Sequence, residues 1–338
     1  MKTIEATYKI VTPMFIGSAD QKPDDGIRPP SFKGALRFWW RALHWGKFYQ
    51  DCDGNETAAL KALHQKESEL FGSAVKDGKG GQGVFLLSIK QPKSIAQDSS
   101  WPSSKPLGQS GFLGMGLWES GDRAKGNFQP HRIGLTSDHP FTVNLCFRGQ
   151  TSENDIKSIK HALKALGLLG GLGSRSRRGF GSIALINMDE KEFRSDDLMS
   201  YKQTIQDLFS KLQVSDVMPP FTAWSVESRI GLLERLQASE KDAHKQAAKL
   251  FYQVRGQKAE VRGVSKRGFG QPLPLKPMKK EYDQRRASPL LFHIHPIGNK
   301  YICSHIFLPA QFLPHEGSDM NFFNGVNVYM NKLSEVQL

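Results

Sequence analysis

The sequence predicts an α+β protein made of two successive halves. Alternating, strand-like runs and helix-like apolar stripes follow one another along the whole chain instead of gathering in all-helical and all-strand regions. The 338 residues exceed one typical domain and fit two, and 38% hydrophobic residues suffice for real cores. We therefore expect one domain at 1–190 and a second at 191–338.

The first half begins with a strand and a long helix. Residues 4–12, IEATYKIVT, place apolar and polar side chains on opposite faces of a strand. Residues 31–46 predict a helix with Ser31 as its N-cap and Gly46 as its stop. The helix carries an apolar stripe to bury and, on another face, a basic ridge formed by Lys33, Arg37, Arg41 and His44.

The remaining elements of the first half have the order of a ferredoxin-like unit. We expect a helix at about 56–70, strands at 84–90, 140–148 and 182–188, and a helix that Ser152 and Asp155 open as a capping box. A long insertion rich in Ser, Gly and Pro occupies about 91–139. Setting it aside, the order is strand, helix, strand, strand, helix, strand, which is typical of that fold.

The second half predicts a similar, less regular unit. Its expected elements are a helix capped by Ser195, a strand near 221, helices at about 227–237 and 239–255, hairpin arms at 288–297 and 300–309, and a last helix at about 319–334. The two halves share a short repeat, because the sequence Arg-Gly-Phe-Gly at 178–181 recurs at 267–270. Four residues are weak support for a duplication.

The balance of charge points to a polyanionic partner. Lys and Arg total 46 against 33 Asp and Glu, so the formal net charge is +13. Nucleic acid, a membrane surface and a phosphorylated ligand all fit such a surplus. No apolar run is long enough for a transmembrane helix, and the N-terminus lacks a signal-peptide core. The three cysteines, Cys52, Cys146 and Cys303, predict no disulfide partner and a cytoplasmic location.

The most specific local signal is the glycine-rich segment 167–182. Glycines let the backbone approach a ligand and turn its N–H groups toward anions, and the interleaved arginines offer forked donors that suit phosphate. The segment follows a helix and precedes a strand, which is the reverse of a P-loop, and it lacks the Gly-Lys-Ser/Thr ending. We therefore expect no nucleoside-triphosphate site. The alternative is a flexible connection between a helix and a strand.

Two stretches, IRPPSFKGALRFWWRALHWG at 27–46 and GLGSRSRRGFGS at 171–182, are similar to the signature regions of the RAMP superfamily of type III CRISPR effector proteins. Residues 12–41 and 285–290 further resemble the first-numbered RAMP subunit of type III-B (Cmr) complexes. The resemblance implies two tandem ferredoxin-like (RRM-like) domains with a glycine-rich RAMP loop. It also implies a non-catalytic subunit at the end of the complex distal to the 5′ tag of the guide. There it would lie beside the RAMP backbone subunits and contact the 3′ region of the guide RNA and its target duplex.

The resemblance also assigns residues to RNA. The expected RNA-binding residues are Arg28, Lys33, Arg37, Trp40, Arg41, Arg175, Arg177, Arg178, Arg267, Arg285 and Arg286, with Gly171, Gly173, Gly179 and Gly181 in the loop. The chemistry agrees, since basic groups bind phosphates and aromatic or guanidinium planes stack bases. Trp40 is one turn from Arg37 and could stack a base, and its alternative is burial beside Trp39. A solvated helix face is the alternative for Lys33 and Arg37.

Catalytic and metal-binding alternatives stay open on a few residues. His293 and His295 share a strand face opposite Cys303 and His305, but their spacing matches no standard zinc pattern, so we expect no metal and no cofactor. A metal-independent RAMP endoribonuclease that processes guide precursors would need a general base, and His44 and His131 are the candidates. Asp24 and Asp25 are expected to be turn residues.

Two further expectations concern assembly. An assembly scaffold, which would contact protein more than RNA, is a third possible function. The insertion at 91–139 contains Trp101, Phe112, Trp118 and Phe128, which are many aromatic residues for a disordered loop. We expect part of the insertion to fold onto RNA or a neighbouring subunit.

Overall fold

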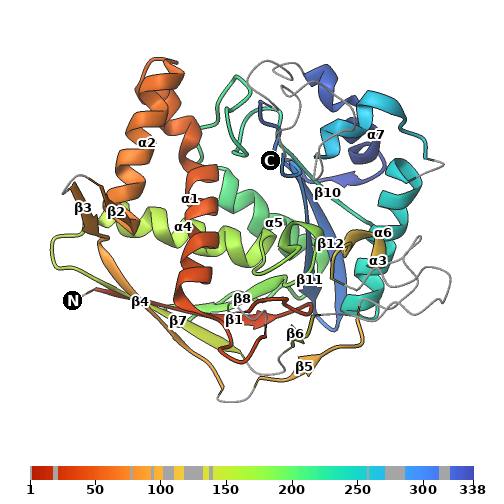
Figure 1. Cartoon of the computed structure of the whole chain (residues 1–338), viewed down its shortest axis with the longest axis horizontal. Helices are drawn as coiled ribbons and strands as arrows, with labels where there is room; N and C mark the ends of the chain where they lie inside the picture. The colour runs from red at the N-terminus through yellow and green to blue at the C-terminus, as the bar shows by residue number, and fades with distance from the viewer. Residues whose placement is uncertain are drawn as a thin grey trace.

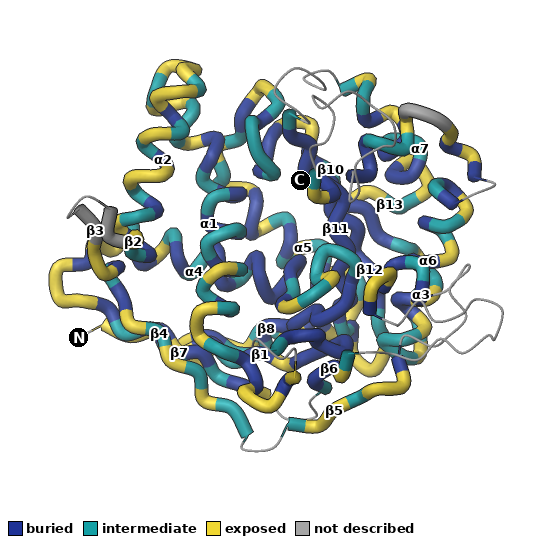
Figure 2. The backbone as a smooth tube through the Cα atoms, viewed as in Figure 1, coloured by how far each residue is buried: buried dark blue, intermediate teal, exposed yellow. Residues whose placement is uncertain are grey.

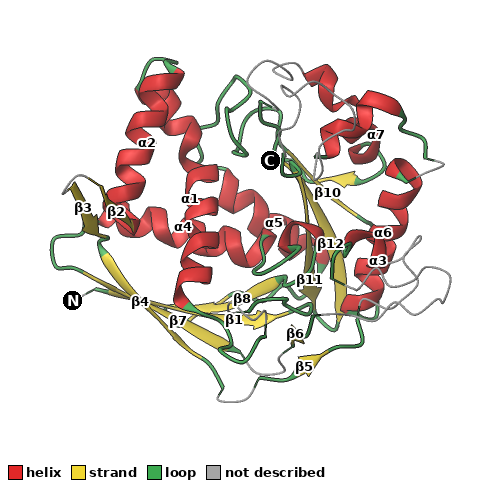
Figure 3. Ribbon diagram, in the orientation of Figure 1, coloured by secondary structure: helices red, strands yellow, loops and turns green. Residues whose placement is uncertain are grey.

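Two antiparallel sheets form the framework of the molecule, and helices pack around them (Figure 1, Figure 3). The architecture comes from a computed structural model, which describes residues 2–17, 22–76, 79–92, 95–101, 110–117, 132–136, 140–256, 259–270, 286–311 and 320–338. Among these residues, none of the helices combines the length and hydropathy that crossing a membrane requires.

The first sheet has the strand order β4-β7-β1-β8-β9. Its strands are β1 (Thr3–Ile10), β4 (Phe85–Lys90), β7 (Phe141–Phe147), β8 (Ile183–Met188) and β9 (Lys191–Glu192). The helices of this unit are α1 (Pro29–Asp51), α2 (Glu56–Phe71) and α4 (Glu153–Leu169). All neighbouring strands are antiparallel. Strand, helix, two strands, helix and strand thus form a ferredoxin-like unit, as the sequence predicts.

The second sheet repeats this topology, with the order β11-β12-β10-β13. Its elements are β10 (Arg229–Leu232), α6 (Glu240–Arg255), β11 (Leu290–Ile297), β12 (Lys300–Phe307), α7 (Asn324–Met330) and β13 (Ser334–Glu335). α5 (Leu198–Phe209) connects the two units. The sheet has α4 and α5 on one side and α6 and α7 on the other (Figure 1). The two tandem ferredoxin-like units are therefore confirmed.

Shorter elements complete the chain. They are β2 (Gly72–Lys76), β3 (Lys79–Gln82), β5 (Gln97–Asp98), α3 (Ser110–Leu113), β6 (Gly134–Leu135) and the 3-10 helices η2 (Ser176–Arg178), η3 (Gly263–Phe269) and η5 (Met320–Phe323). β5, α3 and β6 lie in the insertion, and η2 lies in the glycine-rich loop.

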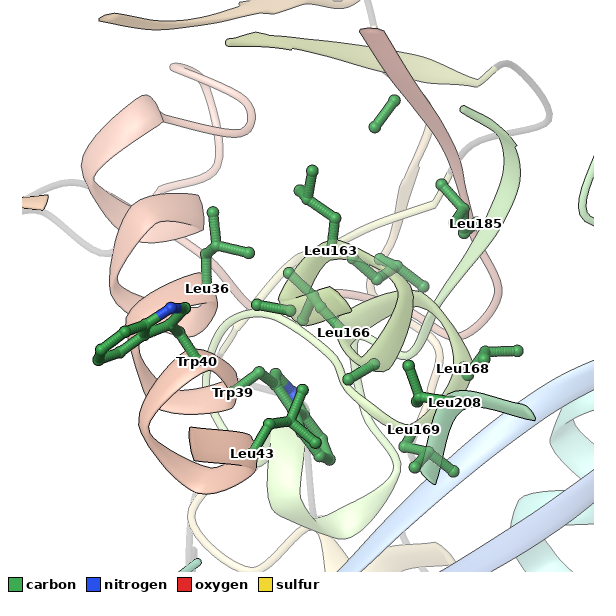
Figure 4. Close-up of a cluster of buried hydrophobic side chains, with 14 of the residues drawn as sticks. Leu36, Trp39, Trp40, Leu43, Leu163, Leu166, Leu168, Leu169, Leu185 and Leu208 are labelled. Carbon is green, nitrogen blue, oxygen red and sulfur yellow. The ribbon is translucent and has the colours of Figure 1, made fainter. Parts of the chain in front are cut away.

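Two hydrophobic clusters hold the units together (Figure 2). The first joins the inner stripes of α1 and α4, where Leu36 and Trp39 pack against Leu163 and Leu166 (Figure 4). It extends to α5. The second surrounds α6 and includes Trp101 from the insertion. This part of the insertion therefore belongs to the core next to the second sheet.

The ends of α1 differ from the sequence prediction. The helix starts at Pro29 with Arg28 as its N-cap, because proline suits the first helical position, so the expected N-cap Ser31 lies inside the helix. Gly46 is not a stop, since α1 continues for five more residues. Gly46 is buried where residues 213–214 pack directly on the helix, which leaves no room for a side chain.

The second half holds more corrections. Asp197 and not Ser195 caps α5, through a complete capping box with Ser200. The helix expected at 227–237 is wrong, because β10 forms there and pairs with β12 and β13. The strand expected near 221 does not form. The last helix is shorter than predicted, with η5 before α7 and β13 after it.

Two glycines of α1 give opposite expectations for substitution by alanine. Gly34→Ala should raise the free energy of unfolding by about 0.5–1 kcal/mol, since nothing lies within 4 Å of the new methyl group. Gly46→Ala should lower it by about 1–3 kcal/mol, because its Cβ would lie 2.1 Å from the carbonyl oxygen of Gln213. Urea denaturation measures both, and equal stability of the two variants would contradict this packing.

Candidate nucleic-acid interface

The glycine-rich loop folds tightly onto its surroundings. A Cβ at Gly181 would lie 2.0 Å from the carbonyl oxygen of Leu172, and one at Gly173 would lie 2.7 Å from that of Phe15. The N–H group of Gly181 donates to the carbonyl of Pro13 at 2.9 Å. This glycine therefore serves close backbone packing, and the expected presentation of its N–H group to an anion is wrong. The guanidinium groups remain as the anion-binding chemistry.

One buried histidine fixes the position of the loop. The Nε2 of His244, on α6, lies 2.7 Å from the carbonyl oxygen of Arg178, and its Nδ1 lies 3.0 Å from Oγ of Ser110 in the insertion. Burial lowers the pKa of His244 to about 4, so the ring is neutral. This network assigns the proton to Nε2, which donates to the carbonyl. Trp101 and Phe180 pack on the same ring.

Five arginines surround a cavity of about 410 Å³ beside this loop. Arg175, Arg177 and Arg178 come from the loop, Arg255 from the end of α6, and Arg286 from the segment before β11. The described lining residues include no carboxylate. Apolar walls complete the lining, with Phe112, Leu113, Met115, Phe251 and Phe269.

Aromatic rings and carbonyl groups hold the guanidinium groups in place. Arg178 packs on Phe251 and Phe292, with ring centroids 4.9 and 5.6 Å from its guanidinium carbon. Arg177 donates to the carbonyl oxygen of Ser288 at 2.7 Å. These contacts orient the cations but supply no negative charge.

The arginines lower the pKa values of one another. Burial, followed by the nearby Arg255 and Arg175, lowers the pKa of Arg178 to about 9. Burial and the charge of Arg286 lower that of Arg177 to about 10. The groups stay protonated at neutral pH, so the cavity concentrates positive charge with no counter-charge in its described lining. Such a site favours an anion.

A second hollow of about 420 Å³ shares Arg177, Arg286 and Ala287 with the lining of this cavity. Its other lining residues are Phe38, Arg41, Leu60, Leu63, His64, Glu67, Phe221 and Thr222. We call these two neighbouring hollows, which share three lining residues, the arginine groove. The groove runs from α6 and the insertion to the face between α1 and α2, so it crosses from one ferredoxin-like unit to the other.

The basic ridge of α1 is partly neutralised. Arg37 Nε and Arg41 Nη1 lie 2.7 and 2.6 Å from the same oxygen, Oε1 of Glu67 on α2, whose side chain is 3% exposed. Three groups together thus carry one net positive charge. Lys33 Nζ lies 5.7 Å from the ring centroid of Phe85 and does not line the groove. Only Arg41 of the ridge reaches the groove.

Trp40 does not stack RNA bases, because it is 1% exposed. Its indole Nε1 donates to Oγ of Ser158 at 3.0 Å, and its ring stacks on that of His44 (Figure 4 shows Trp40 beside the core). Burial in the core, the alternative interpretation of the sequence, is therefore correct. Burial also lowers the pKa of His44 to about 4, and its Nδ1 contacts the carbonyl of Trp40.

The remaining predicted residues lie away from the groove or outside the described chain. Arg28 donates to the carbonyl of Gly17 at 2.9 Å, and Arg267 lies over the ring of Phe322. Neither lines the groove. Asp24 and Asp25 form a turn, as expected. The RNA contact expected for Arg285 and the general-base role considered for His131 fall outside the described residues.

The histidines and the cysteine of the hairpin formed by β11 and β12 are structural. His293 pairs with Ser304 across the hairpin, whereas Cys303 pairs with Ile294. His293 and His295 therefore point to one face of the sheet, and Cys303 and His305 point to the other. All four side chains are buried, and His293 contacts the carbonyl of Gly170. Within the described ranges, no group of His, Cys, Asp and Glu has the arrangement of a metal site.

The RNA-binding residues predicted from the sequence do not include Arg255, although a basic residue in the last helical turn followed by Gly256 is a local signal. Phe112 is predicted only as one of the aromatic residues of the insertion, and Met115 has no signal in the sequence. Packing of the insertion on α6 brings both to the cavity. On the outer face of the first sheet, β1 presents Thr3, Glu5, Thr7 and Lys9 and no aromatic side chain.

The fold and the loop define a class of protein. A family model for the RAMP superfamily matches residues 7–184, from β1 through the glycine-rich loop into β8. The chain therefore belongs to the RAMP superfamily.

Individual relatives agree with this membership. The chain is similar to two proteins of Pyrococcus furiosus: CRISPR system Cmr subunit Cmr1-2 (29% identical, covering 51% of this chain and 89% of that protein) and Cmr1-1 (27% identical, covering 81% and 78%). Among solved structures, apo Cmr1 from P. furiosus matches with a TM-score of 0.60 at 20% identity over 99% of each chain. A chain of the type III-B Cmr-beta complex bound to cognate target RNA matches with a TM-score of 0.61 at 12% identity over 98% of each chain. These matches confirm the resemblance to the first-numbered Cmr subunit.

His244 makes stability sensitive to acid. The unfolded chain binds a proton at His244 near pH 6.5, and the folded chain does so only near pH 4, so its contribution to stability is present above pH 6.5 and is lost as the pH falls toward 4. In His244→Gln the free energy of unfolding should depend less steeply on pH in this window, by up to about 1.4 kcal/mol per pH unit. Denaturation at several pH values measures the slope. Parallel curves for His244→Gln and wild type would contradict the assignment.

Proposed function

We propose that this protein is a non-catalytic RNA-binding subunit of a type III-B CRISPR effector complex in antiviral defence. In this proposal it works in the cytoplasm at the tip near the 3′ end of the guide and contacts guide and target RNA. The observation that carries the proposal is the arginine groove, which holds six arginines and apolar side chains beside the glycine-rich loop. Support comes from relatives that are named Cmr subunits and from a fold shared with a chain of an RNA-bound Cmr complex.

The chemistry of the groove favours RNA over a membrane. Its guanidinium groups lie in a concave site beside apolar walls, where a strand would place both phosphates and unstacked bases. A membrane surface would instead meet a flat or protruding basic patch. The continuity of the groove across both units suits an extended ligand.

Charge reversal at the junction of the two hollows tests RNA binding. Arg177→Glu with Arg286→Glu should weaken binding of a single-stranded RNA by about 10- to 100-fold, because each substitution removes a charge-assisted hydrogen bond and adds repulsion. The slope of log affinity against log salt should flatten by about 0.7 for each phosphate that the variant no longer binds. Filter binding or fluorescence anisotropy at several salt concentrations measures both quantities.

Arg194→Glu is the matched control, because Arg194 is exposed, pairs with Asp196 and lies outside the groove. It should bind RNA as the wild type does. A double variant that folds and keeps full RNA affinity would refute the groove as the binding site. Binding to the assembled complex that survives loss of Arg175, Arg177 and Arg178 would favour the scaffold function instead.

Arg37 and Arg41 need a different design, because reversing either charge would set two carboxylates beside each other in a buried site. The triple variant Arg37→Gln, Arg41→Gln, Glu67→Gln removes the ion pairs without leaving a buried charge unpaired. Loss of RNA affinity in this variant should be below about tenfold, since only Arg41 reaches the groove. A loss as large as that of the double variant at 177 and 286 would contradict this ranking.

An endoribonuclease that processes guide precursors is the second candidate. His44 is a poor general base because its ring is stacked and its Nδ1 is engaged, whereas His64 lines the second hollow and is exposed. Incubation of guide precursor with the protein in EDTA should yield no products with 2′,3′-cyclic phosphate ends. Such products, lost in His64→Ala, would replace the non-catalytic proposal.

A further inference from the structure

The cavity at the α6 end of the arginine groove contains donors that lack a partner. Nη1 of Arg178 and Nε of Arg255 are buried without a hydrogen-bond partner among the described residues, although both side chains line the cavity. Buried donors of this kind are costly unless an acceptor satisfies them. The described lining supplies no carboxylate, so an anionic oxygen from a ligand is the acceptor that suits the guanidinium groups of this cavity.

An apolar part of the lining of this cavity comes from the insertion. Met115 is 49% exposed, and the half-buried Phe112 packs at 5.8 Å from the ring of Phe251 and at 5.1 Å from that of Tyr252. Arg175, whose φ of +61° places it in the left-handed region, extends toward Gly116 in the turn that carries Met115. The apolar wall and the cationic wall thus face one volume.

We propose that this cavity is a bay for a single nucleotide, whose phosphate binds Arg178 and Arg255 and whose base lies against Met115 and Phe112. The inference rests on the proposed function and deepens it, because it gives one nucleotide of the RNA a separate pocket and gives the insertion a binding role. A volume of about 410 Å³ falls in the range of small-ligand sites. Forked guanidinium donors suit phosphate oxygens, and a thioether beside an aromatic ring suits the flat face of a base.

Titration of the full-length protein with AMP, adenosine and inorganic phosphate tests the bay. AMP should bind, adenosine should bind at least about tenfold more weakly, and phosphate alone should also bind more weakly than AMP. Arg255→Gln should weaken AMP binding by about tenfold or more. Met115→Ser should weaken binding of AMP and leave that of phosphate unchanged. Isothermal titration calorimetry measures all of these affinities.

Two control variants match the chemistry of these changes. Met199→Ser replaces a methionine on α5 that is 80% exposed, and Arg194→Gln replaces an exposed arginine outside the groove. Both should bind AMP as the wild type does. Equal affinity for AMP and adenosine, or AMP affinity unchanged in a folded Arg255→Gln protein, would overturn the bay.

Competition between AMP and an RNA of about 12 nucleotides, a length typical of single-strand binding sites, identifies the source of the nucleotide. Competition only by RNA with a terminal phosphate would assign the bay to a strand end, and competition also by RNA with hydroxyl ends would assign it to an internal nucleotide. Absence of competition by either RNA would overturn the bay as part of the RNA path. RNA binding that depends on Arg177 and Arg286 while AMP fails to bind would refute the bay and leave the proposed function standing.

Discussion

The hydrogen bond between His244 and the carbonyl of Arg178 is the contact on which the arrangement of the molecule depends. It joins the glycine-rich loop of the first unit to α6 of the second, and the other ring nitrogen joins the insertion through Ser110. Gly179 makes this approach possible, because a Cβ there would lie 3.0 Å from the imidazole Cδ2. Three segments distant in sequence therefore share one buried ring, which joins the two units beside the hydrophobic clusters that they share. The geometry of the arginines is a consequence of the same contact, since Arg178 belongs to the loop that His244 holds.

This packing leaves a concentration of positive charge that the protein alone only partly compensates. The faces of aromatic rings supply some negative potential to Arg178, and the carbonyl of Ser288 does so for Arg177. By contrast, Arg37 and Arg41 meet a full carboxylate in Glu67. The arginines thus fall into two groups, those that pair with a carboxylate and those that do not. The first group ties α1 to α2, and the second lies beside the loop in a cavity whose described lining holds no acid. Compensated cations build the fold, and uncompensated ones are available to a ligand.

The sequence predicts the parts of this structure that depend on local periodicity. Four strands of the first sheet (β1, β4, β7 and β8), α2, α6 and the β11–β12 hairpin follow from alternation, helical stripes and caps. Contacts between distant segments were not predictable. Trp40 lies one turn from Arg37, a spacing that would also suit an exposed residue on the same helix face. Its burial follows from contacts with distant segments, such as the hydrogen bond to Ser158 on α4. Residues 229–232 lie in a leucine-rich run that suits a helix, but pairing with β12 makes them a strand. The pairing of Glu67 with α1 and the position of Met115 also depend on tertiary structure, so these parts of the groove had no sequence signal.

The groove lies at the junction between the two units and not on the open face of either sheet. RNA-binding proteins of ferredoxin-like topology commonly stack bases on aromatic side chains of the open sheet face. Here the open face of β1 carries Thr, Glu and Lys, and the second sheet has helices on both faces. Basic and apolar groups meet instead at the junction between the units, in the arginine groove. The loop supplies cations there, but its own side chains are Ser, Arg and Leu with Phe180 buried. The flat apolar surface beside these cations comes from the part of the insertion at 110–117, whose Phe112, Leu113 and Met115 line the cavity.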